Sequence, residues 1–391
     1  MQSGLGGRRA AVLGAGRQGR CAAYDLAVHA GAETVTICDH DDGVLDDALA
    51  TLRRLAPDAS FAAATADASS RASMRRVLDG AAAAVSAVPY RFGVEAATAA
   101  VDCGCSLVDL GGNTDVSRRI LDLGNEAKRA GCVLVPDTGL APGLLTTLAA
   151  DGMRRMEEPK SVRMWCGGLP DGEVPPFGYR LVFNIEGLFN EYSGEALALR
   201  DGRLARIPAL SEIEPVELPG VGKLEAFPTS GGTSTAPESL AGKLDEYDYR
   251  TVRYPGHATR FRAFAELGLL QDGSLPLDSG EMVRPRDLLA RLLTPLLERP
   301  DVPDLVVARV EVRGRDGGAE TSVTYDLLDR QDPVTGFTAM ERTTAHPAAC
   351  VAEMAAAGEI EPGARRLETE VDPSRFLARF ESRPVKLSID A

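Results

Sequence analysis

A glycine-rich turn near the N-terminus limits what this chain can fold into more than any other feature. The apolar run 10–13 leads into Gly14-Ala-Gly16-Arg-Gln-Gly19, and a helical pattern of apolar residues follows. A strand that enters a helix through G-x-G-x-x-G is typical of the first unit of a dinucleotide-binding domain. A second apolar run ends at Asp39, 25 residues after Gly14, where such domains place an acid. Together these features predict a dinucleotide site.

Each residue of the turn has an expected role. Gly14 permits the tight turn, Gly16 lets the backbone approach a pyrophosphate, and Gly19 allows the helix to pack closely on the strand. The free N–H groups of the helix N-terminus would face the phosphates, so Arg17 and Gln18 are expected beside the cofactor. A glycine turn in a domain that binds nothing is the alternative, and the spacing of strand, helix and acid makes it the weaker one.

Asp39 bears on which dinucleotide is bound. Its carboxylate would accept hydrogen bonds from the adenosine ribose hydroxyls. The next residues are His40, Asp41 and Asp42, so no Arg or Lys stands there to meet a 2′-phosphate, and two acids would repel one. The sequence therefore predicts NAD in preference to NADP.

Short apolar runs alternate with helical patterns up to about residue 140. The runs that we interpret as strands are 10–16, 34–39, 81–89, 106–112 and 132–137. Alternating strands and helices predict a parallel sheet with helices on both faces. We therefore expect an α/β fold with a Rossmann-type doubly wound domain over residues 1–140.

The pattern changes from Ala141 onward. Turns rich in Pro and Gly now separate runs that resemble antiparallel strands, at 161–168, 179–185, 248–256, 305–314 and 320–329. We predict a second, α+β domain with a mixed or antiparallel sheet over residues 141–345. A helical pattern then opens a C-terminal segment, residues 346–391.

Two loops of the first domain are candidate binding elements because each follows a predicted strand. Loops at the carboxyl ends of parallel strands face the ligand crevice. The residues expected toward the nicotinamide half are Val88, Pro89, Tyr90, Gly111 and Asn113. For each of them an ordinary βα turn is the alternative, with Tyr90 packed at the rim or Asn113 capping a helix.

Composition argues against several classes of function. The chain has 43 Lys and Arg against 57 Asp and Glu, a net charge of −14, which disfavours a nucleic-acid surface. Its 4 His are not paired at ligand spacing, so no metal site is expected. The 7 scattered Cys suggest reduced thiols. The N-terminus lacks the apolar core of a signal peptide and no apolar stretch suits a membrane span, so we expect a cytoplasmic protein.

The stretch 227–235, FPTSGGTST, is open to two interpretations. Ser, Thr and Gly are typical of a flexible linker, but hydroxyls and unhindered N–H groups also hold small polar ligands. The stretch lies inside the second domain, far from the change near residue 140. Its position favours a binding loop over a linker.

These motifs together resemble the saccharopine dehydrogenase-like family, and within it the lysine 6-dehydrogenases most. The likeness rests on SAVPY, VDLGGN, VPDTGLAPGLLTTLA, RLVFNIEGLFNEY, LEAFPTSGGTST and YRTVRYPGH. It runs over nearly the whole chain and is densest at 179–260.

The resemblance implies an NAD-dependent oxidation at an amine-bearing carbon. Lysine 6-dehydrogenases oxidise the terminal amine of L-lysine, release ammonia, and give a semialdehyde that closes to a piperideine carboxylate. The resemblance also implies a homodimer built through the second domain, and a C-terminal segment that returns to the Rossmann domain. A saccharopine- or carboxynorspermidine-type dehydrogenase acting on a secondary amine, or a non-catalytic NAD-sensing protein, are the alternatives.

The family-like stretches hold the candidate substrate residues. Hydride leaves carbon only when the nitrogen lone pair is free, so a base must take a proton from the amine. Glu186 and His257 are the candidate bases, and Tyr90 is a further catalytic candidate. Arg253 could bind a substrate carboxylate. A hydrogen-bonded structural His257, a helix-start Glu186 and an ion-paired Arg253 are the structural alternatives.

The head group of an amino-acid substrate needs donors and acceptors of its own. The hydroxyls of Thr229 and Ser230 and the backbone of Gly231 could supply them, and Asn113 could contribute from the first domain. These residues complete the predicted substrate site.

Overall fold

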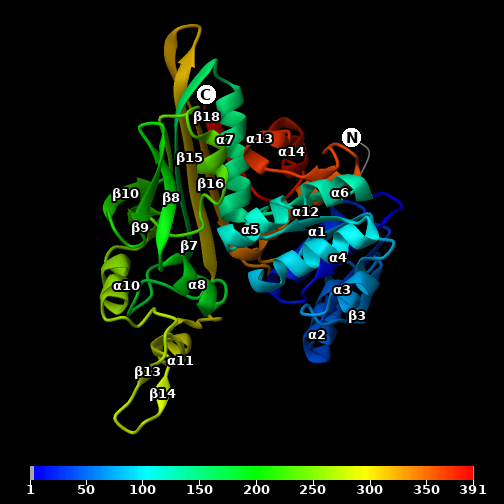
Figure 1. Ribbon diagram of the computed structural model, residues 1–391, viewed down its shortest axis with the longest axis horizontal. Helices are drawn as coiled ribbons and strands as arrows, with labels where there is room; N and C mark the ends of the chain where they lie inside the picture. Colours follow the sequence, from blue (N-terminus) through cyan, green and yellow to red (C-terminus); the bar gives the residue numbers. More distant parts are fainter. Residues whose placement is uncertain (1–3, 391) are drawn as a thin grey trace. The chain divides into compact units, whose positions relative to one another are not determined.

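The computed structural model describes residues 4–390 (Figure 1). They divide into two compact units, each made of segments that are not contiguous in sequence. Unit 1 contains the residues up to Asp151, Ser234–Ser239 and Glu341–Val385. Unit 2 contains Gly152–Thr233, Leu240–Met340 and the residues from Lys386 onward.

Unit 1 is built on a seven-stranded sheet. Its strands are β1 (Arg9–Leu13), β2 (Thr34–Asp39), β3 (Phe61–Thr65), β4 (Ala83–Ser86), β5 (Ser106–Asp109), β6 (Val133–Val135) and β17 (Gly363–Ala364). They lie in the order β17-β6-β5-β4-β1-β2-β3, and all neighbours pair in parallel. The predicted Rossmann-type sheet is confirmed. The order reverses between β1 and β4, and open sheets of this kind bind ligands at the strand ends beside that point.

The helices of unit 1 are α1 (Arg17–Val28), α2 (Asp42–Leu55), α3 (Arg71–Leu78), α4 (Gly93–Cys103), α5 (Thr114–Leu121), α6 (Gly124–Ala130), α7 (Leu145–Arg154), α9 (Ala236–Leu240), α12 (Ala339–Ala356), α13 (Leu367–Glu370) and α14 (Pro373–Phe380). Asp41, Ser70 and Asn113 begin α2, α3 and α5 by accepting hydrogen bonds from first-turn N–H groups. Gly104 and Gly131, both left-handed, end α4 and α6.

The C-terminal part of the chain completes unit 1. β17 extends the sheet by pairing with β6. Asp25 of α1 is fully buried and accepts hydrogen bonds from Arg383 at 3.0 and 3.2 Å, while Nδ1 of His346 lies 2.5 Å from the same carboxylate. Removing one partner would leave a buried charge without compensation, so these contacts hold the C-terminal segment to the first helix.

Unit 2 is built on a nine-stranded sheet. Its strands are β7 (Glu158–Pro170), β8 (Glu195–Arg200), β9 (Arg203–Pro208), β10 (Glu214–Leu218), β11 (Gly222–Phe227), β12 (Glu246–Arg253), β15 (Asp304–Asp316), β16 (Ala319–Arg330) and β18 (Leu387–Asp390). β7 and β12 pair in parallel, whereas the other pairs are antiparallel. The predicted mixed sheet is therefore confirmed.

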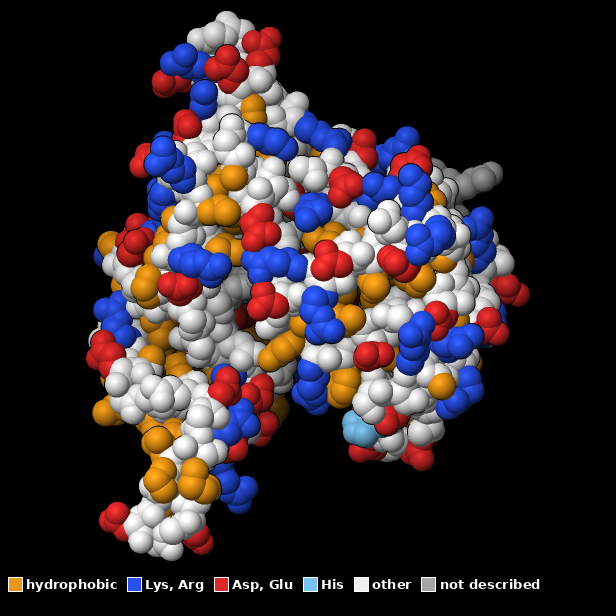
Figure 2. Space-filling view, viewed as in Figure 1, with side chains coloured by type: hydrophobic (Ala, Val, Ile, Leu, Met, Phe, Trp, Pro, Cys, Tyr) orange, Lys and Arg blue, Asp and Glu red, His pale blue; other side chains and the backbone are white. Residues whose placement is uncertain are grey.

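An arm extends from unit 2. It consists of the hairpin β13 (Leu275–Pro276) and β14 (Met282–Val283) and the helix α11 (Pro285–Leu297). One face of α11 is buried through Leu289, Leu293 and Leu297. The opposite face exposes Leu288, Leu292 and Leu296, at helical spacing. Hydrophobic side chains gather on this arm in Figure 2.

The strand predicted at 179–185 is wrong. Within the described residues this segment joins no sheet; it is a buried loop that ends where Asn184 caps α8 (Ile185–Glu191). Four consecutive residues, 179–182, are buried, so the apolar run reflects burial on all sides. A backbone hydrogen bond from Leu181 to Leu297 holds it in place of a strand ladder. Helix α10 (His257–Glu266) also belongs to unit 2.

Two further features are absent from residues 4–390. No helix there is long and apolar enough to cross a membrane. No group of three or more His, Cys, Asp and Glu side chains there could hold a metal ion.

Candidate functional site

The three glycines of the turn after β1 differ in the space around them. Gly14 has φ +98°, and a Cβ there would lie 2.9 Å from the carbonyl oxygen of Ala87. A Cβ on Gly19 would lie 1.8 Å from the carbonyl oxygen of Gly14. A Cβ on Gly16 would meet nothing within 4 Å. Packing therefore requires Gly14 and Gly19, whereas the space beside Gly16 admits a ligand at the N-terminus of α1.

Asp39 ends β2 beside this turn. Its Oδ2 accepts a hydrogen bond from the Ala15 N–H at 2.9 Å, and its Oδ1 accepts one from the His40 N–H at 2.8 Å. Partial burial alone would raise the pKa of Asp39, but the N–H groups of Ala15, Asp41 and His40 outweigh it and hold the pKa below its ordinary value. A fixed, ionised carboxylate here fits the ribose hydroxyls of a dinucleotide.

The other residues predicted around the cofactor serve the fold as well. Asp41 accepts hydrogen bonds from the first turn of α2, and Asp42 accepts one from the Thr65 hydroxyl at 2.6 Å. Arg17 forms an ion pair of 3.0 Å with Glu341. Gln18 follows Arg17 in the first turn of α1.

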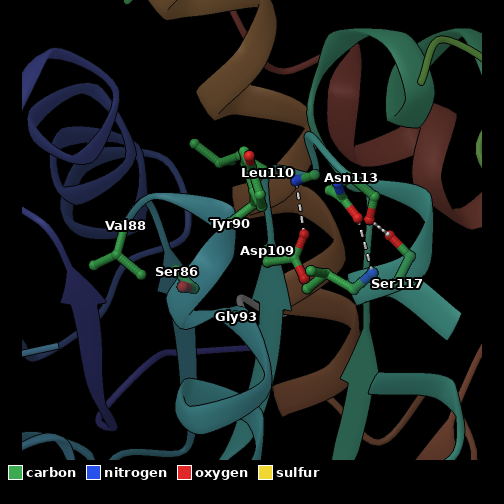
Figure 3. Close-up of a pocket in the computed structure, with 10 residues that line it drawn as sticks. Ser86, Val88, Tyr90, Gly93, Asp109, Leu110, Asn113 and Ser117 are labelled. Atoms are coloured by element: carbon green, nitrogen blue, oxygen red, sulfur yellow. Dashed lines mark hydrogen bonds between the residues drawn. The ribbon is translucent and has the colours of Figure 1, made fainter. Parts of the chain in front are cut away.

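A small pocket lies at the carboxyl ends of β4 and β5 (Figure 3). It brings together residues of the two loops selected from the sequence. Val88 and Tyr90 come from the loop after β4, and Gly111 and Asn113 from the loop after β5. Pro89 lies between two residues of the lining and begins the tight helical turn Tyr90–Phe92.

Gly111 and Asn113 also hold the pocket wall in shape. Gly111 has φ +81°, and a Cβ there would lie 2.7 Å from Oδ1 of Asp137. The side-chain oxygen of Asn113 accepts hydrogen bonds of 3.1 Å from the N–H groups of Asp115 and Val116. Asn113 thus caps α5 and lines the pocket at the same time.

Two carboxyl groups, Asp109 and Asp137, meet beside the pocket. Asp109 is the last residue of β5 and Asp137 follows β6, so both lie at the same edge of these neighbouring parallel strands. Oδ1 of Asp109 accepts the Asp137 N–H at 3.1 Å, and Oδ2 of Asp137 accepts the Ser234 hydroxyl at 2.5 Å. Burial raises the pKa of both groups, and the charge of Asp109 helps to raise the pKa of Asp137 to about 7. The pair therefore holds a proton near neutral pH.

Backbone strain coincides with this pair. Asp137 has φ +63° and Ser234 has φ +46°, left-handed values that are uncommon outside glycine. The side chains of these two strained residues are joined by the hydrogen bond described above. Strained non-glycine residues cluster at functional sites, which marks this edge of the sheet as a candidate site.

In unit 2, Arg253 and His257 belong to one chain of buried hydrogen bonds. Nδ1 of His257 lies 3.0 Å from the Phe177 carbonyl oxygen, which can only accept, so Nδ1 carries the proton. Nε2 then accepts the Tyr192 hydroxyl at 2.8 Å, and the Tyr192 oxygen accepts Nε of Arg253 at 3.0 Å. Burial, with the charge of Arg253, lowers the pKa of His257 to about 3. Both ring nitrogens are engaged, and the ring is neutral.

Glu191 is the carboxylate of this cluster that reaches solvent. It lies 3.8 Å from Arg253, and its side chain is 36% exposed. Burial of its surroundings raises its pKa to about 7, although Arg253 opposes that rise. A carboxyl group with such a pKa can exchange a proton near neutral pH.

Glu186 lies in the first turn of α8, where its side chain is 50% exposed. It forms an ion pair of 3.0 Å with Nε of Arg286. Arg286 also donates a hydrogen bond to Asn190 at 2.6 Å. Glu186 is therefore placed in a second cluster of unit 2, organised by Arg286.

The loop 227–235 is anchored through its own hydroxyls. Thr229 pairs with the Thr251 hydroxyl at 2.8 Å, and the hydroxyl of Ser230 donates to the Asn190 carbonyl at 2.5 Å. Gly231 has φ +86° and open space around it. These contacts are typical of a packed loop, in contrast to a linker.

Sequence reasoning did not single out several residues that the structure brings together: Asp109, Asp137, Ser234, Glu191 and Tyr192. A signal was available for two of them, because Asp109 and Asp137 lie within two predicted strands of one parallel sheet. Ser234 lies 97 positions from Asp137, and its contact depends on topology that local patterns do not contain.

The chain matches two protein-family models. Residues 139–385 match the saccharopine dehydrogenase C-terminal domain, and residues 10–135 match the saccharopine dehydrogenase NADP binding domain. Among curated relatives, a saccharopine dehydrogenase [NADP(+), L-glutamate-forming] of Pyricularia oryzae is 23% identical over 49% of this chain and 44% of its own length. The chain spans less than half the length of the curated relatives that it matches here, between 20% and 44%.

Solved structures share the fold. The apo saccharopine dehydrogenase (L-Glu forming) of Saccharomyces cerevisiae is similar with a TM-score of 0.79 and 19% identity, over 98% of this chain and 100% of that one. The homospermidine synthase of Legionella pneumophila, solved in complex with NAD, has a TM-score of 0.67 and 11% identity, over 98% and 91%. With its Rossmann-type sheet, mixed second sheet and matched domains, the chain belongs to the saccharopine dehydrogenase family of NAD(P)-binding oxidoreductases.

Proposed function

We propose that the chain oxidises the terminal amine of L-lysine, or of a close diamino acid, to the semialdehyde. The observation that carries the proposal is the pocket beside the dinucleotide turn, whose wall includes Asp109, the hydrogen-bond partner of the Asp137 N–H. A buried site with a net negative charge suits a primary ammonium group. Water would then release ammonia from the oxidised carbon, and the product would close to a piperideine carboxylate.

We further propose NAD as the cofactor in preference to NADP. NAD, when bound, accepts the hydride. The space beside Gly16 and the fixed carboxylate of Asp39 support binding of the pyrophosphate and of an unphosphorylated ribose. A wild-type preference for NADP in steady-state kinetics would contradict this proposal.

The structural observations that support a role in the reaction differ among the predicted substrate residues. Tyr90 and Asn113 line the pocket and could orient the amine. Glu186 is exposed enough to exchange protons with solvent, whereas His257 could act only through Tyr192. The role predicted for Arg253, binding a substrate carboxylate, is supported by the burial of its positive charge.

A second candidate is a dehydrogenase that joins or splits a secondary amine. It is supported by the names of two relatives, a saccharopine dehydrogenase and a homospermidine synthase. Such a substrate is larger than lysine and carries an additional charged arm. The two candidates therefore differ in whether a carbonyl co-substrate is needed.

The test is NADH formation with a panel of amines, including L-lysine, L-ornithine and saccharopine. Turnover of L-lysine alone, with one ammonia released per NADH formed, is the expected result. Reductive activity that requires a 2-oxo acid or an aldehyde together with an amine would favour the secondary-amine candidate.

We also propose that the protein is a cytoplasmic homodimer. All seven cysteines are free, in keeping with a reducing compartment. The exposed apolar face of α11 and the adjoining hairpin offer a surface that a second copy of the chain would cover. Sedimentation analysis of the wild type and of Leu292→Lys should give a dimer and a monomer respectively; dimers of equal stability would exclude this face.

A further inference from the structure

Asp109 combines a fixed orientation with a place in the wall of the pocket (Figure 3). The N–H groups of Gly111 and Asp137 both donate to its Oδ1, at 2.6 and 3.1 Å. Within residues 4–390 these are the donors that its carboxylate receives, so the lone pairs of Oδ2 are available to a ligand. A carboxylate held in this way needs little reorganisation when a cation binds.

Asp137 is enclosed where Asp109 is not. Its Oδ2 accepts the Ser234 hydroxyl, and its Oδ1 lies against Gly111. The residue is only 6% exposed. Two neighbouring carboxyl groups cannot both ionise without strong repulsion. The enclosed Asp137 therefore keeps the proton, and the single negative charge of the pair belongs to Asp109.

We propose that Asp109 is the general base of the amine oxidation, a role that rests on the function proposed above, and that Asp137 is a positioning residue for it. The charge of the pair matches that of one primary ammonium group. An N–H bond of the ammonium breaks, the proton goes to Oδ2 of Asp109, and the electron pair stays on nitrogen. That pair then forms the C=N bond as hydride leaves the adjacent carbon for the nicotinamide cofactor.

Burial favours this transfer from both sides. It raises the pKa of Asp109 and lowers the pKa of an ammonium group taken out of water, so the two values approach each other. Two ionisable groups near the pair are Glu368, which repels a charge on Asp137, and Tyr90, which lines the pocket. Neither of them is a cation, so the ammonium would be the positive partner of Asp109.

Binding of n-butylamine to the NADH-loaded protein tests the site without turnover. Calorimetry should show binding by the wild type and by Asp122→Asn, a control that removes an exposed carboxylate at the end of α5. Asp109→Asn should bind about 10- to 100-fold more weakly, because a charge-assisted hydrogen bond is lost. Equal affinity in all three proteins, or no binding by the wild type, would overturn the proposal.

Kinetics then separate a base from a merely structural carboxylate. With the amine that the wild type oxidises best, Asp109→Asn should lower kcat by about 10²- to 10⁴-fold while NADH affinity stays unchanged. Asp137→Asn keeps an acceptor for Ser234 and, like the protonated acid, carries no charge, so the acidic limb of kcat/KM should stay in place while the change that follows ionisation of Asp137 near pH 7 should be lost. An Asp109→Asn variant within about threefold of wild-type kcat would exclude Asp109 as the base.

The two levels of proposal can fail separately. If L-lysine is not oxidised but another amine is, the proposed substrate is wrong, and Asp109 is judged with that amine. If no amine is oxidised, the n-butylamine measurement decides alone.

Discussion

Unit 1 and unit 2 each place carboxylates, hydroxyls and a buried charge in one small region, but they use these groups differently. Around Arg253 in unit 2, the polar atoms satisfy one another: arginine donates to tyrosine, tyrosine to histidine, and histidine to a backbone carbonyl. At the strand ends of unit 1, polar groups line a pocket, and one carboxylate oxygen keeps its lone pairs. A stretch of polar residues therefore indicates a functional site only where the fold leaves some of their hydrogen-bonding groups without a protein partner.

The largest expected effect contrasts two glycines of the same turn. Gly19→Ala should destabilise the protein by about 3 kcal/mol or more, because its Cβ would overlap the Gly14 carbonyl. Gly16→Ala should leave the free energy of unfolding within about 1 kcal/mol and weaken NADH binding instead. Urea unfolding and fluorescence titration with NADH measure the two effects. If Gly16→Ala binds NADH normally, the open space there is not part of the cofactor site.

Arg253→Met should destabilise unit 2 by about 1–3 kcal/mol, because the buried Tyr192 hydroxyl would lose a donor and Glu191 its ion-pair partner. Arg206→Met is the control, since the Arg206 side chain is 66% exposed and its ion pair with Glu195 is long, 3.7 Å. Urea unfolding gives both values. A variant that keeps its stability but shows a raised KM would instead place Arg253 in the substrate site, which would weaken the contrast between the two regions.

Asp137→Asn should stabilise the protein above neutral pH. The pKa of Asp137 is raised to about 7 in the fold, above the value of about 3.9 for an unfolded chain. The folded state therefore holds a proton that the unfolded state releases, and stability is lost as pH rises through that window. Asparagine lacks this penalty, so the gain in Tm over wild type should grow from pH 5 to pH 8. A gain that does not change with pH would mean that Asp137 is ionised in the fold.

The smallest effect is expected for Glu186→Gln. Half-exposed ion pairs contribute about 0–1 kcal/mol, and Arg286 keeps its bond to Asn190. Thermal unfolding should therefore barely change. A large loss of kcat without loss of stability would make Glu186, and not Asp109, the leading base.

Local sequence patterns were sufficient to predict part of the fold and of the candidate site. The glycine turn, Asp39 and the helix cap at Asn113 are each defined within a few residues, so both their conformation and their place could be predicted. Tyr179 and Leu181 show the limit, since an apolar run buried on all sides has no alternation to distinguish a strand from a packed loop. Asp109, Asp137 and Ser234 come from three distant segments, and only the strand order brings them together.

The return of the chain's end to unit 1 has a consequence for how the protein is made. Asp25 and Arg383 are 358 positions apart, and the edge of β6 is covered only when β17 has been synthesised. The ribosome therefore synthesises most of unit 1 long before it synthesises the C-terminal segment that completes the fold of this unit. Contacts of such long range slow folding and expose strand edges meanwhile. A stop codon anywhere before residue 385 would thus damage the first part of the protein to be translated as much as the last.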